Sequence, residues 1–187
     1  MVLHIKNMVC TRCKMVVKAE LEQLGFNPLA VNLGEVELSQ KSLTQAQTNT
    51  IAEALAKFGF ELLADKKKQL VEQAKTAIIE QVHYAAEPLK VNFSDYLSQK
   101  LGIEYGTLSA VFSETEHNTI EKYVIQQKIE KVKELLTYGE SSLSEIAYLL
   151  NYSSVAHLSA QFKKISGQTP SAYKRSQQTS RKTLDEI

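Results

Sequence analysis

The hydrophobic pattern of the first third of the chain changes its period several times. Polarity alternates along the first residues, as in a half-buried strand, and apolar residues then recur at helical spacing. The predicted elements are, in order, a strand at 2–5, a helix at 13–24, strands at 29–33 and 35–38 that meet at Gly34, a helix ended by Gly59 and a strand at 60–64. This order predicts an α+β domain of the ferredoxin-like βαββαβ kind.

Beyond residue 65 the pattern is helical throughout. Apolar side chains from Leu70 to Val82 share one helical face, and similar faces follow along the chain. The run Asp65-Lys66-Lys67-Lys68 is a dense charge cluster that marks a junction, although a solvated helix start fits it equally well. The predicted domains are an N-terminal domain at 1–65 and an all-α domain at 66–180, followed by a flexible tail at 181–187.

The helical part contains an internal repeat. A shift of fifty residues aligns Ser94 with Ser144, Asp95 with Glu145, Leu108 with Leu158, Ser109 with Ser159, Ala110 with Ala160, Phe112 with Phe162, Thr119 with Thr169 and Tyr123 with Tyr173. Each unit has a short helix, a turn and a second short helix, which predicts two helix-turn-helix units joined by a long helix at 119–138. Capping boxes are expected at Asn118 with Glu121 and at Ser142 with Glu145.

Composition narrows the class of protein. The chain has 187 residues, 43% of them hydrophobic, and a net charge of +1, so it is globular and any nucleic-acid footprint must be local. The N-terminus has no signal-peptide pattern, and no stretch approaches the ~20 apolar residues that cross a bilayer. We therefore expect a cytoplasmic protein without a membrane partner. No catalytic triad or P-loop occurs, so we expect no enzyme.

The two cysteines of the chain are Cys10 and Cys13, at the predicted step from a strand into a helix. Backbone N–H groups and the helix dipole favour thiolates there. Two soft ligands separated by two residues suit Cu(I) or a similar thiophilic ion better than Mg²⁺ or Ca²⁺. No second Cys pair or nearby His pair completes a tetrahedral zinc site. The pair alone fits metal binding, thiol redox chemistry or chance.

The surroundings of the cysteines resemble a known family. The stretches are Asn7-Met8-Val9-Cys10-Thr11-Arg12-Cys13, Leu24-Gly25-Phe26, Val31-Asn32-Leu33 and Phe58-Gly59-Phe60. Together they resemble the heavy-metal-associated domain of copper chaperones and copper ATPases, with Asn7 where that family usually has Gly. The resemblance implies that Cys10 and Cys13 bind Cu(I) or another soft metal ion, that Met8 supports the loop from the core, and that Phe60 packs beside it.

The second helical repeat resembles another family. The segment 143–174 contains Phe162-Lys163-Lys164, then Gly167-Gln168-Thr169-Pro170, then Tyr173-Lys174. It resembles the second helix-turn-helix of AraC/XylS-type transcription regulators, and the likeness extends from about Leu70 to Lys174. The resemblance implies a DNA-binding unit that acts as a monomer on double-stranded promoter DNA, with two recognition helices joined by a rigid helix.

Helical spacing separates a buried from an outward face in the second recognition helix. The residues predicted to be buried are Val155, Leu158, Phe162 and Ile165, and Tyr148, Tyr152 and Tyr173 are also expected in the core. Those predicted to face DNA are Ser153, Ala156, His157, Ala160, Lys163 and Lys164, with Lys163, Lys164, Lys174 and Arg175 on phosphates. From Lys122 to Lys182 ten basic and four acidic residues give a local charge of +6.

The first recognition helix offers weaker chemistry. Ser109 and Ser113 are its candidate contacts, and it contains no Lys or Arg. Family members often place Arg where Ala110 and Ala160 stand. Two functions follow: a metal-responsive transcription regulator, or a metal carrier whose helical half no longer binds DNA strongly. A thiol oxidoreductase is the third candidate function.

Overall fold

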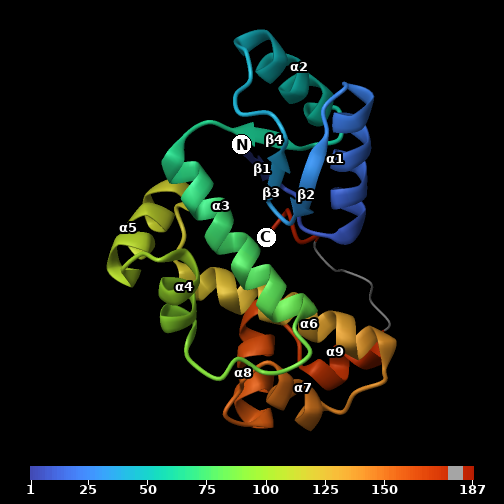
Figure 1. Ribbon diagram of the computed structural model, residues 1–187. Coiled ribbons are helices and arrows are strands. Elements are labelled where there is room, and N and C mark those ends of the chain that lie inside the picture. The colour runs from blue at the N-terminus through green and yellow to red at the C-terminus, as the bar shows by residue number, and fades with distance from the viewer. Residues whose placement is uncertain (177–182) are drawn as a thin grey trace. The chain divides into compact units, whose positions relative to one another are not determined.

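The computed structural model describes residues 1–176 and 183–187 and divides into two compact units, Met1–Thr76 and Ala77–Ile187 (Figure 1). The division falls within helix α3 (Lys66–Ile79), whereas the predicted junction lies at the start of this helix. Part of the predicted tail, with Arg181 and Lys182, lies outside the described residues.

The first unit is a small antiparallel sheet with helices. Its elements are β1 (Val2–Lys6), α1 (Thr11–Gln23), β2 (Pro28–Asn32), β3 (Glu35–Leu38), α2 (Gln45–Ala56) and β4 (Glu61–Leu63). The strand order is β2-β3-β1-β4, and each neighbouring pair is antiparallel. The predicted succession of strands and helices is therefore observed, with end shifts of a few residues.

The core of this unit lies between one face of the sheet and helices α1 and α2. Alternate strand residues, among them Leu3, Ile5, Val36 and Leu38, are buried with Val17, Leu21, Ile51 and Leu55 of the helices. This period of two is what a sheet buried on one face requires. Phe58, which shares the helical spacing of Ile51 and Leu55, is 51% exposed because α2 ends before it.

The second unit is helical. After η1 (Glu80–Tyr84) its elements are α4 (Phe93–Leu101), α5 (Tyr105–Glu116), α6 (Ile120–Tyr138), α7 (Leu143–Leu149), α8 (Val155–Ser166) and α9 (Pro170–Ser176). The pairs α4–α5 and α7–α8 flank the 19-residue α6, which makes contacts with α5, α8 and α9 (Figure 1). This all-helical arrangement is consistent with a helix-turn-helix domain.

The N-caps of the helices test two predictions. The capping box of α7 is confirmed, because the backbone N–H groups of Ser142 and Glu145 each donate to the other residue's side chain. The box predicted at Asn118 is wrong by one residue. Thr119 caps α6 by accepting from the N–H of Lys122, while the amide oxygen of Asn118 accepts from the N–H of Thr119.

The repeated apolar residues form equivalent cores. Leu108 and Leu158, Phe112 and Phe162, and Tyr123 and Tyr173 are all buried. The ring centroids of Phe112 and Tyr123 lie 5.8 Å apart, and those of Phe162 and Tyr173 lie 5.6 Å apart. The repeat in the sequence is therefore a repeat in packing.

Tyr148 departs from the prediction of a core position. It is 73% exposed, because Ile146 and Ala147 form the buried face of the seven-residue α7.

No helix in the described part of the chain is both long and apolar enough to cross a membrane.

Candidate functional site

Cys10 and Cys13 lie together at the N-terminus of α1. Cys10 is the N-cap with an extended backbone, and its Sγ accepts from the N–H of Cys13 at 3.4 Å. The two Sγ atoms are 3.0 Å apart, and both side chains are half-buried. The strand-to-helix junction therefore aims two sulfur atoms at one point.

The two thiols differ in acidity. Partial burial raises the pKa of Cys10, but hydrogen bonds from the side chain and backbone of Cys13 and from the backbone of Arg12 outweigh it, so this pKa is lowered overall. Burial, then the hydrogen bond between the two thiols, raises the pKa of Cys13. Cys10 is therefore the first to ionise, with the Cys13 thiol donating to it.

Met8 and Phe60 lie in the core below this loop. They are 1% and 7% exposed, and Cys13 packs against the same apolar cluster. This placement agrees with a supporting role, and the role itself stays a prediction. Among residues 1–176 and 183–187, no group of three His, Cys, Asp or Glu side chains could hold a metal ion.

Asn7 is a residue of the loop to which the sequence analysis gave no role. Its φ is 69°, in the left-handed region that Gly or Asn adopts most readily. Its N–H donates to Glu72 Oε1 at 3.1 Å, and its Nδ2 donates to the carbonyl of Gly59 at 2.9 Å. Asn7 therefore joins the loop to the turn before Phe60. The signal for it was the Asn at a position where the resembled family usually has Gly.

The predicted DNA-facing residues lie on α8, just before it at Ser153, and on α9. Ser153, Ala156, His157, Ala160, Lys163 and Lys164 are all exposed, as are Lys174 and Arg175 on α9. Leu158 and Phe162 are fully buried, whereas Val155 is only half-buried. Ile165 was expected in the core and is 48% exposed, so the prediction for this residue is wrong.

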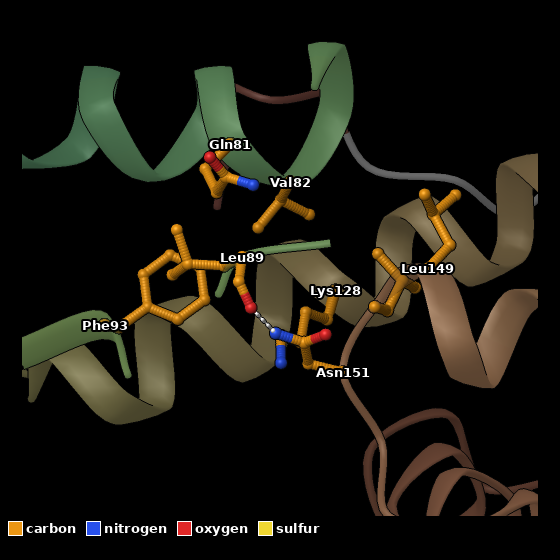
Figure 2. A pocket seen from close by; sticks show the side chains of 8 residues that line it. Gln81, Val82, Leu89, Phe93, Lys128, Leu149 and Asn151 are labelled. Atoms are coloured by element: carbon orange, nitrogen blue, oxygen red, sulfur yellow. Dashed lines mark hydrogen bonds between the residues drawn. The ribbon is translucent and has the colours of Figure 1, made fainter. Parts of the chain in front are cut away.

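Three lysines of the basic segment 122–182 interact with other side chains of the domain, so they are not available for contacts with phosphates. Lys128 lies among Phe93, Leu89 and Asn151 in the lining of a small pocket, with Nζ 5.6 Å and 5.3 Å from the ring centroids of Phe93 and Tyr152 (Figure 2). Burial lowers the pKa of this lysine.

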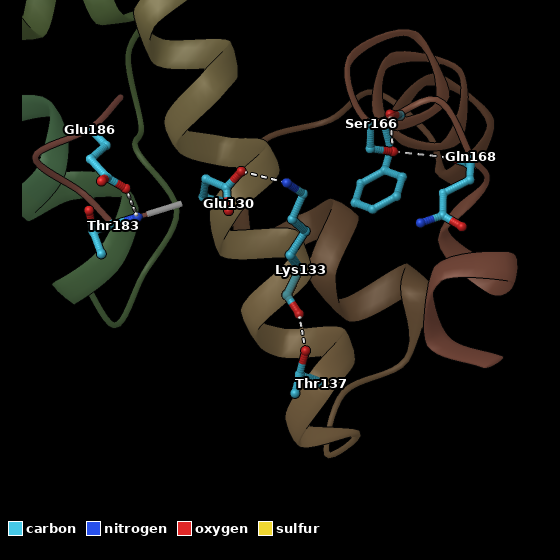
Figure 3. A network of polar contacts seen from close by, with 8 residues as sticks. Glu130, Lys133, Thr137, Ser166, Gln168, Thr183 and Glu186 are labelled. Atoms are coloured by element: carbon cyan, nitrogen blue, oxygen red, sulfur yellow. Dashed lines mark hydrogen bonds and ion pairs between the residues drawn. The ribbon is translucent and has the colours of Figure 1, made fainter. Parts of the chain in front are cut away.

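The other two lysines are paired along α6. Lys133 Nζ lies 2.6 Å from Glu130 Oε1, with only 11% and 7% of the two side chains exposed (Figure 3). Lys131 Nζ lies 2.9 Å from Glu134 Oε1. The predicted charge of +6 therefore overstates the charge available to phosphates. Among the residues that the structure describes, the exposed part of this charge comprises Lys122, Lys163, Lys164, Lys174 and Arg175.

The outward face of α5 is acidic or neutral. Ser109 and Ser113 are only half-buried, and Glu104 caps the helix with an exposed carboxylate. The structure therefore brings candidate cations together at α8 and α9, and offers none along α5.

Comparison with known proteins finds a match for the helical part of the chain. Residues 97–176 match the family described as "Helix-turn-helix domain". A search of curated proteins gives no match.

Three solved structures are similar to the chain. The C-terminal domain of AraT, a response regulator from Geobacillus stearothermophilus, is 24% identical, with a TM-score of 0.52, and the alignment covers 64% of this chain and 94% of that one. The C-terminal domain of the response regulator yesN from Fusobacterium nucleatum is 28% identical, with a TM-score of 0.47, over 55% and 98% of the two chains. The DNA-binding domain of AdpA, solved with a target DNA, is 21% identical, with a TM-score of 0.46, over 60% and 93%.

The AraT likeness shows the fold of the helical part. The match of residues 97–176 supports a DNA-binding transcription regulator. Residues 97–176 of this chain are thus similar to an AraC-type helix-turn-helix domain.

Proposed function

We propose that this protein is a metal-responsive transcription regulator that binds Cu(I) or another soft metal ion and double-stranded promoter DNA. The observation that carries the proposal is the pair of sulfur atoms 3.0 Å apart in the same chain as a helix-turn-helix domain. In this proposal the protein is cytoplasmic and binds DNA as a monomer.

The metal part of the proposal rests on Cys10 and Cys13. Two thiolates suit a soft ion of low coordination number, since a tetrahedral zinc site needs four ligands. The lowered pKa of Cys10 makes one thiolate available first. Met8 and Phe60 hold the loop from the core, and the strand order β2-β3-β1-β4 supports the ferredoxin-like domain that the resemblance implies.

The DNA part of the proposal rests on α8 and α9. Small and polar side chains at Ser153, Ala156 and Ala160 let the helix approach base edges, while Lys163 and Lys164 contact phosphates. Lys174 and Arg175 lie in the last turn of α9 and add to the same footprint.

A second candidate is a metal carrier whose helical half binds DNA weakly. The acidic α5 and the three structural lysines of α6 favour it, because both reduce the attraction for phosphate. The two functions differ in whether metal changes DNA binding.

The test is a salt-dependent binding assay with genomic DNA fragments, run with and without Cu(I). If the protein is a metal-responsive regulator, Cu(I) should change its affinity for DNA, in either direction, by about 5- to 150-fold, the usual range of allosteric coupling. The double variant Cys10→Ser/Cys13→Ser should bind DNA with no response to Cu(I). Strong copper binding without DNA binding by the wild type would instead favour the carrier.

A further inference from the structure

The N-terminal ends of α5 and α8 have opposite hydrogen-bonding chemistry. The two helices occupy the same positions in their repeats, so that Glu104 corresponds to Ser154 and Thr107 corresponds to His157. In a helix-turn-helix unit, the N-terminal residues of the second helix are the ones that contact base edges. The difference therefore lies where DNA is read.

At α8 the cap is neutral and the imidazole ring is held in place. Ser154 Oγ accepts from the N–H of His157 at 3.0 Å, and Ser153 Oγ lies 3.0 Å from His157 Nδ1. The ring packs edge-on against Tyr152, with centroids 5.3 Å apart, and the Tyr152 hydroxyl donates to Gln161 Oε1 at 2.7 Å. A hydrogen bond and a ring contact thus fix the orientation of an exposed side chain.

This orientation leaves Nε2 for a ligand. When the Ser153 hydroxyl donates to Nδ1, the proton of the neutral ring is on Nε2, and Nε2–H is then a donor. The acceptors that it would meet in the major groove are O6 and N7 of guanine, O4 of thymine and N7 of adenine.

At α5 the cap is a carboxylate. Glu104 Oε1 accepts from the N–H of Gly106 at 2.8 Å, and Oε2 accepts from the N–H and the hydroxyl of Thr107 at 2.9 Å and 3.3 Å. A Cβ at position 106 would lie 3.0 Å and 3.1 Å from these oxygens, so the glycine makes room for the carboxylate. The helix end therefore carries a full negative charge in place of the partial positive charge that attracts phosphate.

The last turns of the two helices also differ in charge, with α8 the more positive. Lys163 and Lys164 of α8 correspond to Ser113 and Glu114 of α5. Both ends of α8 are thus suited to an anionic or acceptor-bearing partner, and neither end of α5 is.

On the basis of the proposed DNA binding, we propose that recognition is asymmetric. His157 of α8 reads a hydrogen-bond acceptor on a base, and Glu104 repels the phosphate backbone from the N-terminus of α5. Sequence preference then comes from one half of the operator.

The test exchanges residues between the repeats. The full-length wild type, Glu104→Ser, His157→Thr and the control Glu140→Gln, which removes an exposed charge outside both recognition helices, are each used to select duplexes from a randomised library. Affinities for the wild-type selected duplex and for an unrelated duplex are then measured. Serine remains a favourable cap, and circular dichroism checks the helix content of each variant.

Glu104→Ser should tighten binding to both duplexes by about two- to fivefold more than Glu140→Gln does. His157→Thr should lose the preference at one base pair, with discrimination there falling roughly fivefold or more, while binding to the unrelated duplex stays within about twofold. Equal affinity gains for Glu104→Ser and the control, or an unchanged preference in His157→Thr, would overturn the asymmetry. A wild type that selects no duplex would contradict the proposed function itself.

Discussion

The two helix-turn-helix halves have the same core and different surfaces. Phe112 and Phe162 pack on Tyr123 and Tyr173 with nearly equal ring separations of 5.8 and 5.6 Å. Yet the helices that carry these phenylalanines begin with a carboxylate in one half and a neutral hydroxyl in the other. Packing preserves the repeat, because interior positions tolerate little change in volume, whereas exposed positions are free to differ. The difference between the halves is therefore where function should be sought.

The most severe test of the shared core is to remove each phenylalanine. Phe112→Ala and Phe162→Ala should each lower the free energy of unfolding by about 3–5 kcal/mol, since both rings are fully buried. Chemical denaturation measures the loss. A small loss for one variant beside a large loss for the other would show that the two cores are not equivalent.

The basic segment should contain two kinds of lysine, those that stabilise the fold and those that lie on the surface. Lys133→Ala removes the ion pair with the nearly buried Glu130, so it should cost about 3 kcal/mol of unfolding free energy. The exposed Lys164→Ala should cost less than about 0.5 kcal/mol. Denaturation of both variants measures this, and equal losses would contradict the separation of structural from surface lysines.

The surfaces of the two recognition helices can be compared through salt dependence. Lys163→Ala/Lys164→Ala should weaken binding to every duplex and flatten the salt slope by about 1 to 2 units, because fewer counterions are released. Ser109→Ala/Ser113→Ala is the matched double change on α5 and should do less. If the serine variant proves the more damaging, the ranking of the two helices is reversed.

The smallest effects concern the N-caps of α4 and α7, the first helices of the two helix-turn-helix halves. Asn92→Ala and Ser142→Ala should each cost about 1 kcal/mol, because each side chain accepts a backbone N–H at its helix start. Thermal unfolding measures both losses, and a negligible loss in either variant would contradict its capping role.

The Ser142 cap should also depend on pH. Hydrogen bonds from the backbone and side chain of Ser142 lower the pKa of Glu145. A lowered pKa gives stability that is full above the unfolded value of about 4.3 and is lost as the pH falls through the folded value. The stability difference between wild type and Ser142→Ala should therefore shrink on acidification, and a constant difference would contradict this coupling.

Periodicity was enough to predict the order of elements and the repeated core. It placed the hairpin at Gly34 and the buried Phe162 correctly, because apolar spacing reports directly on which face is covered. It failed at helix ends. Ile165 and Tyr148 have core-type spacing but are 48% and 73% exposed, because spacing alone does not encode which side of a helix the rest of the chain covers.

The chemistry of the candidate sites was only partly predictable. The Cys10–Cys13 pair could be found from spacing, but the bond from Asn7 to Glu72 joins residues 65 positions apart and needs the tertiary fold. The pairing of Lys133 with Glu130 has helical spacing, yet its burial does not follow from the local sequence. Counting charges along the chain therefore overstated the basic surface.

Hydrogen exchange of the full-length protein with and without duplex DNA tests the central claim most directly. Peptides from 153–166, which contain α8, should gain protection on adding DNA, and those from 103–116, which contain α5, should change much less. The protection should decrease in Lys163→Ala/Lys164→Ala. Equal protection of both segments, or protection confined to 103–116, would contradict the account.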